Sequence, residues 1–294
     1  MIRCHAIFLA ALCSLLPTLI AIADSPPIDY YQSENLRKFA DYLYAQGDYL
    51  RAAGEYQRYL FSQSTTLEND RNDILRRIVE SYRLGGQSDR AVQFLETLLQ
   101  TQPNSNLARY ELGATYFLTE RYDESIRSLQ ESQDLFQGGE YRWKSQILIG
   151  MNKLMQKRWK GAVQHFDQLN LDGTPEIVGR RASVYRGYAE GGRDLPSKKP
   201  LLAGLLSTAL PGSGRIYVGR SNDALITLFL LGVLGWGAYD GFSDDGVSSR
   251  KGWILGTLGG IFYLGNIYGS VIAAQTHNRR MEAAFLGTIP LEIP

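Results

Sequence analysis

"NLARYELGATYFLTERYDESIRSLQ", residues 106–130, carries the pattern that decides the fold. Ser125 is a small residue, with the large apolar Leu129 four residues after it and Tyr122 three residues before it. Gly113 lies twelve residues before Ser125. Small residues let two helices approach closely, and large side chains then fill the space beside the contact. The stretch therefore predicts a pair of packed helices.

Three other stretches repeat this pattern: "GDYLRAAGEYQRYL" (47–60), "GQSDRAVQFLETLL" (86–99) and "KRWKGAVQHFDQL" (157–169). The small residue is Ala52, Ala91 or Ala162 in these stretches, and we call these three and Ser125 the anchor residues. Successive anchors are 39, 34 and 37 residues apart. A helix pair of this size leaves an apolar face open, so neighbouring pairs have to stack. The spacing predicts an array of helical repeats.

The four units resemble the tetratricopeptide repeat (TPR), a 34-residue pair of antiparallel helices, and Pro103 falls where that repeat often ends. The resemblance implies an all-α fold with a TPR-like helical solenoid over residues 35–190. The long first spacing is absorbed by a loop over 62–70, and residues 176–190 are expected to form a capping helix. An unrelated helical bundle is the alternative.

Repeats of this family bind peptides or partner proteins in a concave groove lined by the first helix of each unit. Carried over to this chain, the resemblance implies a groove that is charged at one end and apolar at the other. An apolar set that packs against a further element, such as the membrane domain, is the alternative. Some members grip a terminal carboxylate with Lys and Asn, but Asp41 and Glu80 stand where the Asn would be. The expected groove residues are Arg37, Asp41, Tyr44, Arg76, Glu80 and Arg83 at the charged end, and Tyr110, Ala114, Phe117, Ile147, Met151 and Leu154 at the apolar end.

Residues 1–23 have the pattern of a secretory signal peptide. Arg3 begins it, an apolar run follows, and "AIA" at 21–23 is an A-x-A cleavage site. An uncleaved membrane anchor is the alternative. Residues 24–34 form a linker to the repeats.

Little in the chain supports catalysis or metal binding. Both cysteines, Cys4 and Cys13, lie in the signal peptide, so the mature chain has no thiolate and no disulfide. His165 and His277 are far apart in sequence, which leaves no constellation for catalytic residues or metal ligands. The 31 basic and 30 acidic residues are balanced, which gives no indication of nucleic-acid binding. We therefore expect no enzyme activity and no cofactor.

The last third of the chain has the composition of a membrane domain. After a loop-like linker over 191–200, residues 224–239 and 252–275 contain no charged side chain. The second run would reach about 36 Å as a helix, which spans a bilayer core of about 30 Å. We expect a glycine-rich transmembrane domain over 201–275 and a C-terminal tail over 276–294. A buried hairpin of a soluble protein is the alternative.

Glycines recur along the second apolar run. Gly256 and Gly260 are four residues apart, and Gly265 and Gly269 repeat the spacing on another side of the helix. Small residues at this spacing favour close packing of helices in lipid. We expect one glycine face to meet the first apolar helix and the other to meet a third segment or a second copy of the chain. Asn266 is expected to form a hydrogen bond to a neighbouring helix.

The stretch "PGSGRIYVGRS" (211–221) has the glycine spacing of a phosphate-binding loop. Such a loop follows a strand and carries a lysine, whereas here an apolar run precedes it and Arg220 replaces the lysine. The pattern P-G-x-G-x-x-Y-x-G instead resembles a glycine-rich membrane hairpin domain of bacterial envelope proteins, over residues 198–240. That resemblance implies no defined activity.

The number of membrane crossings stays at two or three. If only two helices cross, Arg215, Arg220, Arg279 and Arg280 lie on the side of the exported repeats, against the positive-inside rule. A kinked third crossing over 201–218 would place these arginines inside, and we prefer it.

The sequence therefore predicts a periplasmic TPR scaffold held at the bacterial inner membrane, which binds a protein or peptide partner and the lipid bilayer. A component of an envelope transport or assembly machine, in which the membrane helices are the active part, is the alternative.

Export of the chain predicts a specific N-terminus. Cleavage after "AIA" should give a mature protein that begins at Asp24, which N-terminal sequencing of the purified protein can determine. A mature protein that begins at Met1 would contradict both the cleavage and the periplasmic location of the repeats.

Overall fold

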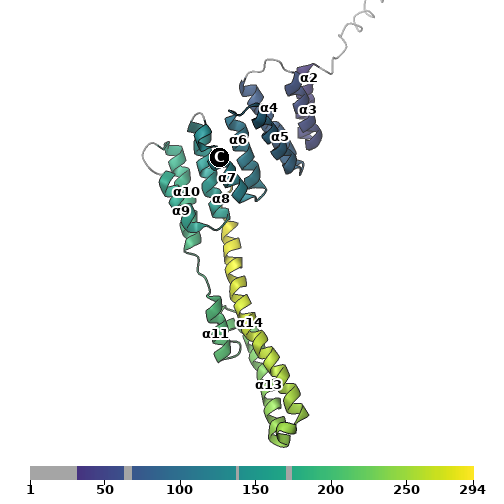
Figure 1. The fold of residues 1–294 in the computed structure, drawn as a ribbon, viewed down its shortest axis with the longest axis vertical. Coiled ribbons are helices and arrows are strands. Elements are labelled where there is room, and N and C mark those ends of the chain that lie inside the picture. The colour runs from purple at the N-terminus through teal and green to yellow at the C-terminus, as the bar shows by residue number, and fades with distance from the viewer. Residues whose placement is uncertain (1–31, 63–67, 137–138, 170–173) are drawn as a thin grey trace, which may run out of the picture. The chain divides into compact units, whose positions relative to one another are not determined.

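The computed structural model describes residues 32–62, 68–136, 139–169 and 174–294 (Figure 1). Within these residues the chain forms helices and no strand, which confirms the all-α fold. The expected signal peptide over 1–23 and most of the expected linker over 24–34 lie outside the described residues. The chain divides into two compact units, Met1–Gln137 and Gly138–Pro294. This division falls inside the expected repeat domain over 35–190, whose bounds remain a prediction, and each unit is described by itself.

The first unit contains three consecutive helix pairs. Each helix packs against the next one along the chain, as stacked repeats do. The pairs are α2 (Ser33–Ala45) with α3 (Tyr49–Ser62), α4 (Glu68–Leu84) with α5 (Ser88–Thr101), and α6 (Asn106–Leu118) with α7 (Tyr122–Glu131), followed by a short 3₁₀ turn, η1 (Gln133–Leu135).

The anchor residues lie where the two helices of a pair touch. All four of them, Ala52, Ala91, Ser125 and Ala162, are fully buried, as the spacing predicts. In the third pair, a Cβ added at Gly113 would lie 2.4 Å from Cδ2 of Leu129. The hydroxyl of Ser125 donates a hydrogen bond of 2.8 Å to the carbonyl of Gly113. The small residues thus bring the helices into contact, and the large residue four positions later fills the space.

The turn inside each pair has the same backbone conformation in all four repeats. Gly47, Gly86, Glu120 and Lys157 lie five residues before their anchors, and each has a positive φ, between 58° and 79°. A left-handed residue at this point ends the first helix and turns the chain into the second. Glycine adopts this conformation without strain, whereas for other residues the left-handed conformation costs about 1–2 kcal/mol of conformational energy.

The second unit begins with the fourth pair, α8 (Gly139–Met155) and α9 (Trp159–Leu169). Gly150 makes room for Phe166, because a Cβ there would lie 2.2 Å from the phenyl ring. The next helix, α10 (Glu176–Arg193), packs on both α8 and α9. It corresponds to the capping helix that was expected over 176–190.

The buried His165 of α9 bonds to the backbone of α8. Its Nε2 lies 2.7 Å from the carbonyl oxygen of Gln146. Burial lowers the pKa of His165 to about 4, despite the opposing effect of the backbone carbonyl. The ring is therefore neutral near pH 7 and donates this hydrogen bond, which is a structural role.

The remaining helices are α11 (Pro200–Ala209), α12 (Ser213–Tyr217), α13 (Ser221–Asp245) and α14 (Arg250–Leu286), with the 3₁₀ turn η2 (Gly246–Ser248) between the last two. Among the described residues, Ser221–Ser248 and Arg250–Leu286 are long and apolar enough to cross a membrane. These two segments pack against each other.

Glycines let α13 and α14 approach most closely near the turn that joins them. A Cβ at Gly241 would lie 2.7 Å from the backbone nitrogen of Gly252, so no side chain fits there. Gly256 is in ordinary contact distance of α13, with Ala238 3.8 Å from the position of an added Cβ. Gly260 and Gly265 have no atom within 4 Å of such a Cβ, and Gly269 lies beside the guanidinium of Arg215. Helix packing at Gly260 and Gly265 therefore stays a prediction.

Residues 201–218 do not continue in one direction, contrary to the preferred kinked third crossing. Gly212, with a φ of 87°, turns the chain back after the ten residues of α11, which reach about 15 Å. The short helix α12 then packs on α11, since a Cβ at Gly214 would lie 2.0 Å from the carbonyl oxygen of Ala203. The segment is a short helical hairpin beside α14.

Asn266 joins this hairpin to α14. Its side chain accepts a hydrogen bond of 3.2 Å from the backbone N–H of Gly212, and its amide lies 3.4 Å from the carbonyl oxygen of Ser207. The prediction that Asn266 bonds to a neighbouring segment is confirmed.

The shared turn conformation makes opposite predictions for two substitutions. Gly86→Ala should lower the free energy of unfolding by about 1 kcal/mol, and Glu120→Gly should raise it by up to about 1 kcal/mol. Both sites are exposed and both have a positive φ, so they form a matched pair. Thermal unfolding of the detergent-solubilised protein, followed by circular dichroism, measures both changes. A destabilised Glu120→Gly protein would contradict the strain at this turn.

Candidate functional site

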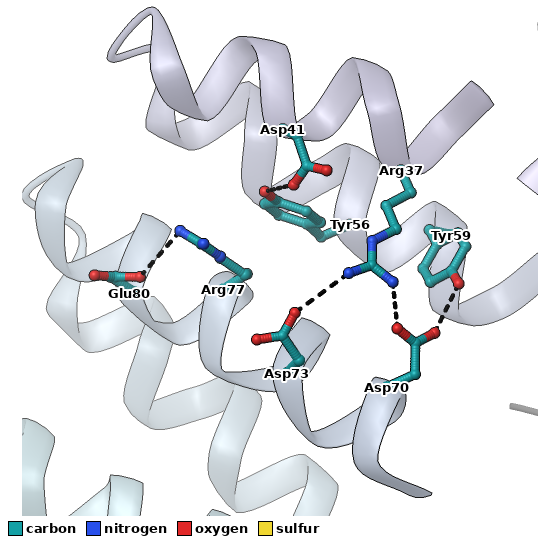
Figure 2. Close-up of polar contacts among 8 residues, drawn as sticks. All are labelled: Arg37, Asp41, Tyr56, Tyr59, Asp70, Asp73, Arg77 and Glu80. Atoms are coloured by element: carbon teal, nitrogen blue, oxygen red, sulfur yellow. Dashed lines mark hydrogen bonds and ion pairs between the residues drawn. The ribbon is translucent and has the colours of Figure 1, made fainter. Parts of the chain in front are cut away.

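The strongest cluster of polar side chains in the first unit lies between α2 and α4 (Figure 2). On α4, four charged residues follow one another at spacings of three, four and three, which places them on one face of the helix. These residues are Asp70, Asp73, Arg77 and Glu80, and they face Arg37 and Asp41 of α2 and Tyr56 and Tyr59 of α3. We call these eight residues the α2–α4 polar face.

Arg37 bridges α2 and α4. Its guanidinium binds the carboxylate of Asp70 and lies 3.4 Å from an oxygen of Asp73. The second oxygen of Asp70 accepts a hydrogen bond of 2.9 Å from the hydroxyl of Tyr59 on α3. Asp70 therefore joins three helices through two bonds, whereas Asp73 has one long contact within this cluster.

A second group of contacts surrounds Tyr56. Its hydroxyl donates a hydrogen bond of 2.6 Å to Asp41, and burial, with a further contribution from that carboxylate, raises the pKa of Tyr56. The guanidinium of Arg77 lies 4.8 Å from the ring centre of Tyr44 and 3.8 Å from the carboxylate of Glu80. The phenol stays protonated and donates, so these contacts hold the carboxylates in fixed positions.

The α2–α4 polar face carries two positive and four negative side chains, a net charge of −2. Each carboxylate contacts a positive charge or a hydroxyl. Such a surface favours a polar or basic partner over an acidic one, because an acidic partner would meet the excess of carboxylates. In the described part of the chain, this face included, no three acidic, histidine or cysteine side chains are grouped so that they could hold a metal ion.

The structure brings part of the expected groove to this face. Arg37, Asp41, Tyr44 and Glu80 lie in it or against it. Arg76 is exposed on α4, and Arg83 forms an ion pair of 3.0 Å with Glu111 of α6.

The expected apolar groove residues are buried. Tyr110 and Phe117 of α6 are each 4 % exposed, and Phe117 packs edge to face against Tyr122. Ala114 on the same helix is buried, as are Ile147, Met151 and Leu154 of α8. Truncating a buried aromatic residue costs about 3–5 kcal/mol, so Ala substitution at Tyr110 or Phe117 would disturb folding as well as any binding. Partner binding by these residues remains a prediction.

Sequence reasoning missed Asp70, Asp73 and Arg77. Their spacing along the chain was a usable signal, because charges three and four residues apart share one helical face. The loop expected over 62–70 hid it: that expectation is wrong at both ends, because α3 includes Ser62 and α4 begins at Glu68, so Asp70 is helical.

Comparison with known proteins supports the helical repeat. Residues 73–105 match the family model described as "Tetratricopeptide repeat", a segment that starts within α4 and continues through α5. A search of the curated proteins finds no match. The matched segment is similar to a TPR unit, and the other helix pairs share its anchor positions and its turn conformation.

The two aspartates beside Arg37 should differ in their effect on stability. Asp70→Asn should lower the free energy of unfolding by about 1 kcal/mol. The neutral amide has one acceptor oxygen, so it can keep the contact with Arg37 or the one with Tyr59 but not both. Asp73→Asn should change the free energy of unfolding by less than about 0.5 kcal/mol, since Asp73 is 52 % exposed and its bond is long. Thermal unfolding of the two variants tests this difference, and equal losses would contradict the central place of Asp70.

Proposed function

We propose that the protein is a membrane-anchored scaffold whose helical repeats bind a protein or peptide partner. The observation that carries this proposal is the run of helix pairs with one TPR-like unit at 73–105, because TPR units generally mediate protein–protein interaction. The comparisons point to no catalytic family. The α2–α4 polar face, which includes Arg37, is the proposed binding surface. Tyr44, Arg76 and Arg83 lie outside that face and are proposed as further partner-binding residues.

The proposed anchor is the pair α13 and α14. Leu225, Ile226 and Phe229 of α13 are each more than 60 % exposed, which is costly in water and favourable in lipid. Trp236 and Trp253 lie toward the turn between the helices, as residues of an aromatic belt do. At this end Lys251 forms an ion pair of 2.5 Å with Asp240.

The proposed location is the bacterial inner membrane, with the repeats in the periplasm. The signal-like pattern over 1–23 supports export. Because 201–218 turn back at Gly212, Arg215 and Arg220 would lie on the exported side, which the positive-inside rule disfavours. Export is nevertheless proposed, because the signal-like segment is synthesised before α13 and α14 and would direct the chain to the membrane first.

The rival proposal, in which the membrane helices are the active part, has less support. The polar residue of the membrane helices that could support an active role is Asn266, which is buried and hydrogen-bonded to Gly212 and Ser207. Its hydrogen-bonding groups are used to hold the α11–α12 hairpin.

Site-specific crosslinking in cells tests partner binding. A photo-reactive benzoylphenylalanine in place of Arg76, on α4, should form a covalent product with a partner protein. The same residue in place of Arg90, an exposed arginine of α5, is the matched control and should form none, because the second helix of a repeat does not line the groove.

Charge reversal on the polar face sharpens the result. Asp73→Lys should reduce the product formed from position 76, since Asp73 is exposed and lies on the same face of α4. Equal products at positions 76 and 90, or a product unaffected by Asp73→Lys, would contradict the α2–α4 polar face as the binding surface.

A further inference from the structure

In the second unit, the end of the chain lies along α10. The hydroxyl of Tyr185 donates its one hydrogen to the carbonyl oxygen of Pro290, at 3.0 Å, and shares it with the carbonyl oxygen of Glu292, at 3.4 Å. Arg181, one helical turn away, donates to the same carbonyl of Glu292 at 3.4 Å and lies 3.6 Å from its carboxylate. Two side chains of α10 thus hold the segment Thr288–Pro294, which we call the tail segment.

These contacts recognise main chain more than side chains. The carbonyls of Pro290 and Glu292 both lie within reach of the Tyr185 hydroxyl, so the main chain of the tail segment turns these two acceptors toward α10. Pro290 and Pro294 have no N–H, so the main chain offers acceptors at these positions and no donor. Tyrosine hydroxyl and guanidinium groups supply the matching donors. The arrangement has the chemistry of a site for a proline-containing peptide segment.

An apolar hollow of about 410 Å³ lies beside the tail segment. Its lining includes Trp143 and Ile147 of α8, Ile177, Val178 and Arg181 of α10, and Pro294 of the tail segment. Ile177 is 71 % exposed, so the tail segment does not cover this apolar surface. A larger apolar side chain at the position of Pro294 would remove more of this surface from water.

The tail segment makes few contacts with α10, but its covalent link to the end of α14 keeps it close to them. Ile289 is buried, whereas Pro290, Leu291 and Glu292 are exposed. The end of α14 is fixed just before it, because Phe285 packs edge to face on Trp159 of α9. A short tether gives a ligand an effective concentration in the millimolar range, so a few contacts are enough to keep it bound.

We propose that α8 and α10 form a second peptide-binding site and that the tail segment is its tethered competitor. The external ligand is a segment of a partner protein with proline, an acidic residue for Arg181 and an apolar side chain for the hollow. Such a ligand displaces the tail segment, so binding opens a site that the chain otherwise keeps closed. This proposal concerns residues other than the α2–α4 polar face and does not rest on binding there.

A peptide of the tail segment tests the proposal directly. Fluorescein-labelled TIPLEIP, residues 288–294, is titrated with the detergent-solubilised full-length protein and with a chain that ends at Gly287, and binding is followed by fluorescence anisotropy. The shortened chain should bind at least about tenfold more tightly, because it lacks the tethered competitor. No binding to the shortened chain, or equal binding to both, would overturn the proposal.

Matched variants identify the site on the shortened chain. Tyr185→Phe should weaken peptide binding about fivefold, as expected for a lost hydrogen bond of about 1 kcal/mol. Tyr188→Phe is the control, because Tyr188 packs on Phe285. The same loss in both variants would show that the peptide binds elsewhere.

Altered peptides test the stated ligand chemistry. TIPLEIF should bind about tenfold more tightly than TIPLEIP, because its phenyl ring can enter the hollow. TIPLKIP should bind more weakly, since its lysine meets Arg181. Unchanged affinities for these two peptides would overturn the assignment of the hollow and of Arg181.

The contact of Tyr185 with the tail segment can also be tested in the full-length protein, which does not depend on folding of the shortened chain. A carboxypeptidase that accepts C-terminal proline should release residues from the Tyr185→Phe protein faster than from the unaltered protein and from Tyr188→Phe. An identical rate of release in all three proteins would mean that Tyr185 does not hold the tail segment, and would overturn the proposal.

Discussion

Leu129 and Phe166 each lie over a glycine of the preceding helix, and this contact sets the geometry of the repeats. A Cβ at Gly113 or Gly150 would lie within 2.4 Å of those side chains, so any larger residue would force the two helices apart. Protein interiors are packed too densely to absorb such a change without strain. The separation of the two helices is therefore fixed at one point, and the stacking of one pair on the next follows from it.

This constraint explains why the repeats could be predicted and why other features could not. Small anchor residues are visible in a sequence, and all four of them are buried. The turn five residues earlier is visible in only two repeats, since Glu120 and Lys157 adopt a conformation that normally favours glycine. Helix packing dictates that backbone whatever the residue, so local preference could not reveal it. Arg37 followed from the repeat geometry, whereas its partner Asp70 was missed because a loop was expected over 62–70 and α4 already begins at Glu68.

The α11–α12 hairpin shows a different limit of sequence reasoning. Apolar residues over 201–218 suggested a crossing, yet the chain turns back at Gly212 because Asn266 accepts its N–H and Ser207 accepts that of Gly214. Backbone groups in an apolar setting need partners, and a turn is stable there only when side chains supply them. Those partners come from α14 and α11, so the turn depends on residues up to 54 positions away.

The two proposed binding surfaces use polar groups in opposite ways. On the α2–α4 polar face, Arg37, Asp70 and Tyr59 already satisfy one another, so a partner gains little by replacing those bonds. Such a surface contributes mainly to selectivity, because a wrongly charged partner leaves carboxylates opposed or unpaired. On α10, Tyr185 and Arg181 bind main-chain carbonyls, which every peptide carries. Selectivity there has to come from the apolar hollow, and affinity is limited by the tail segment that any external ligand must first displace.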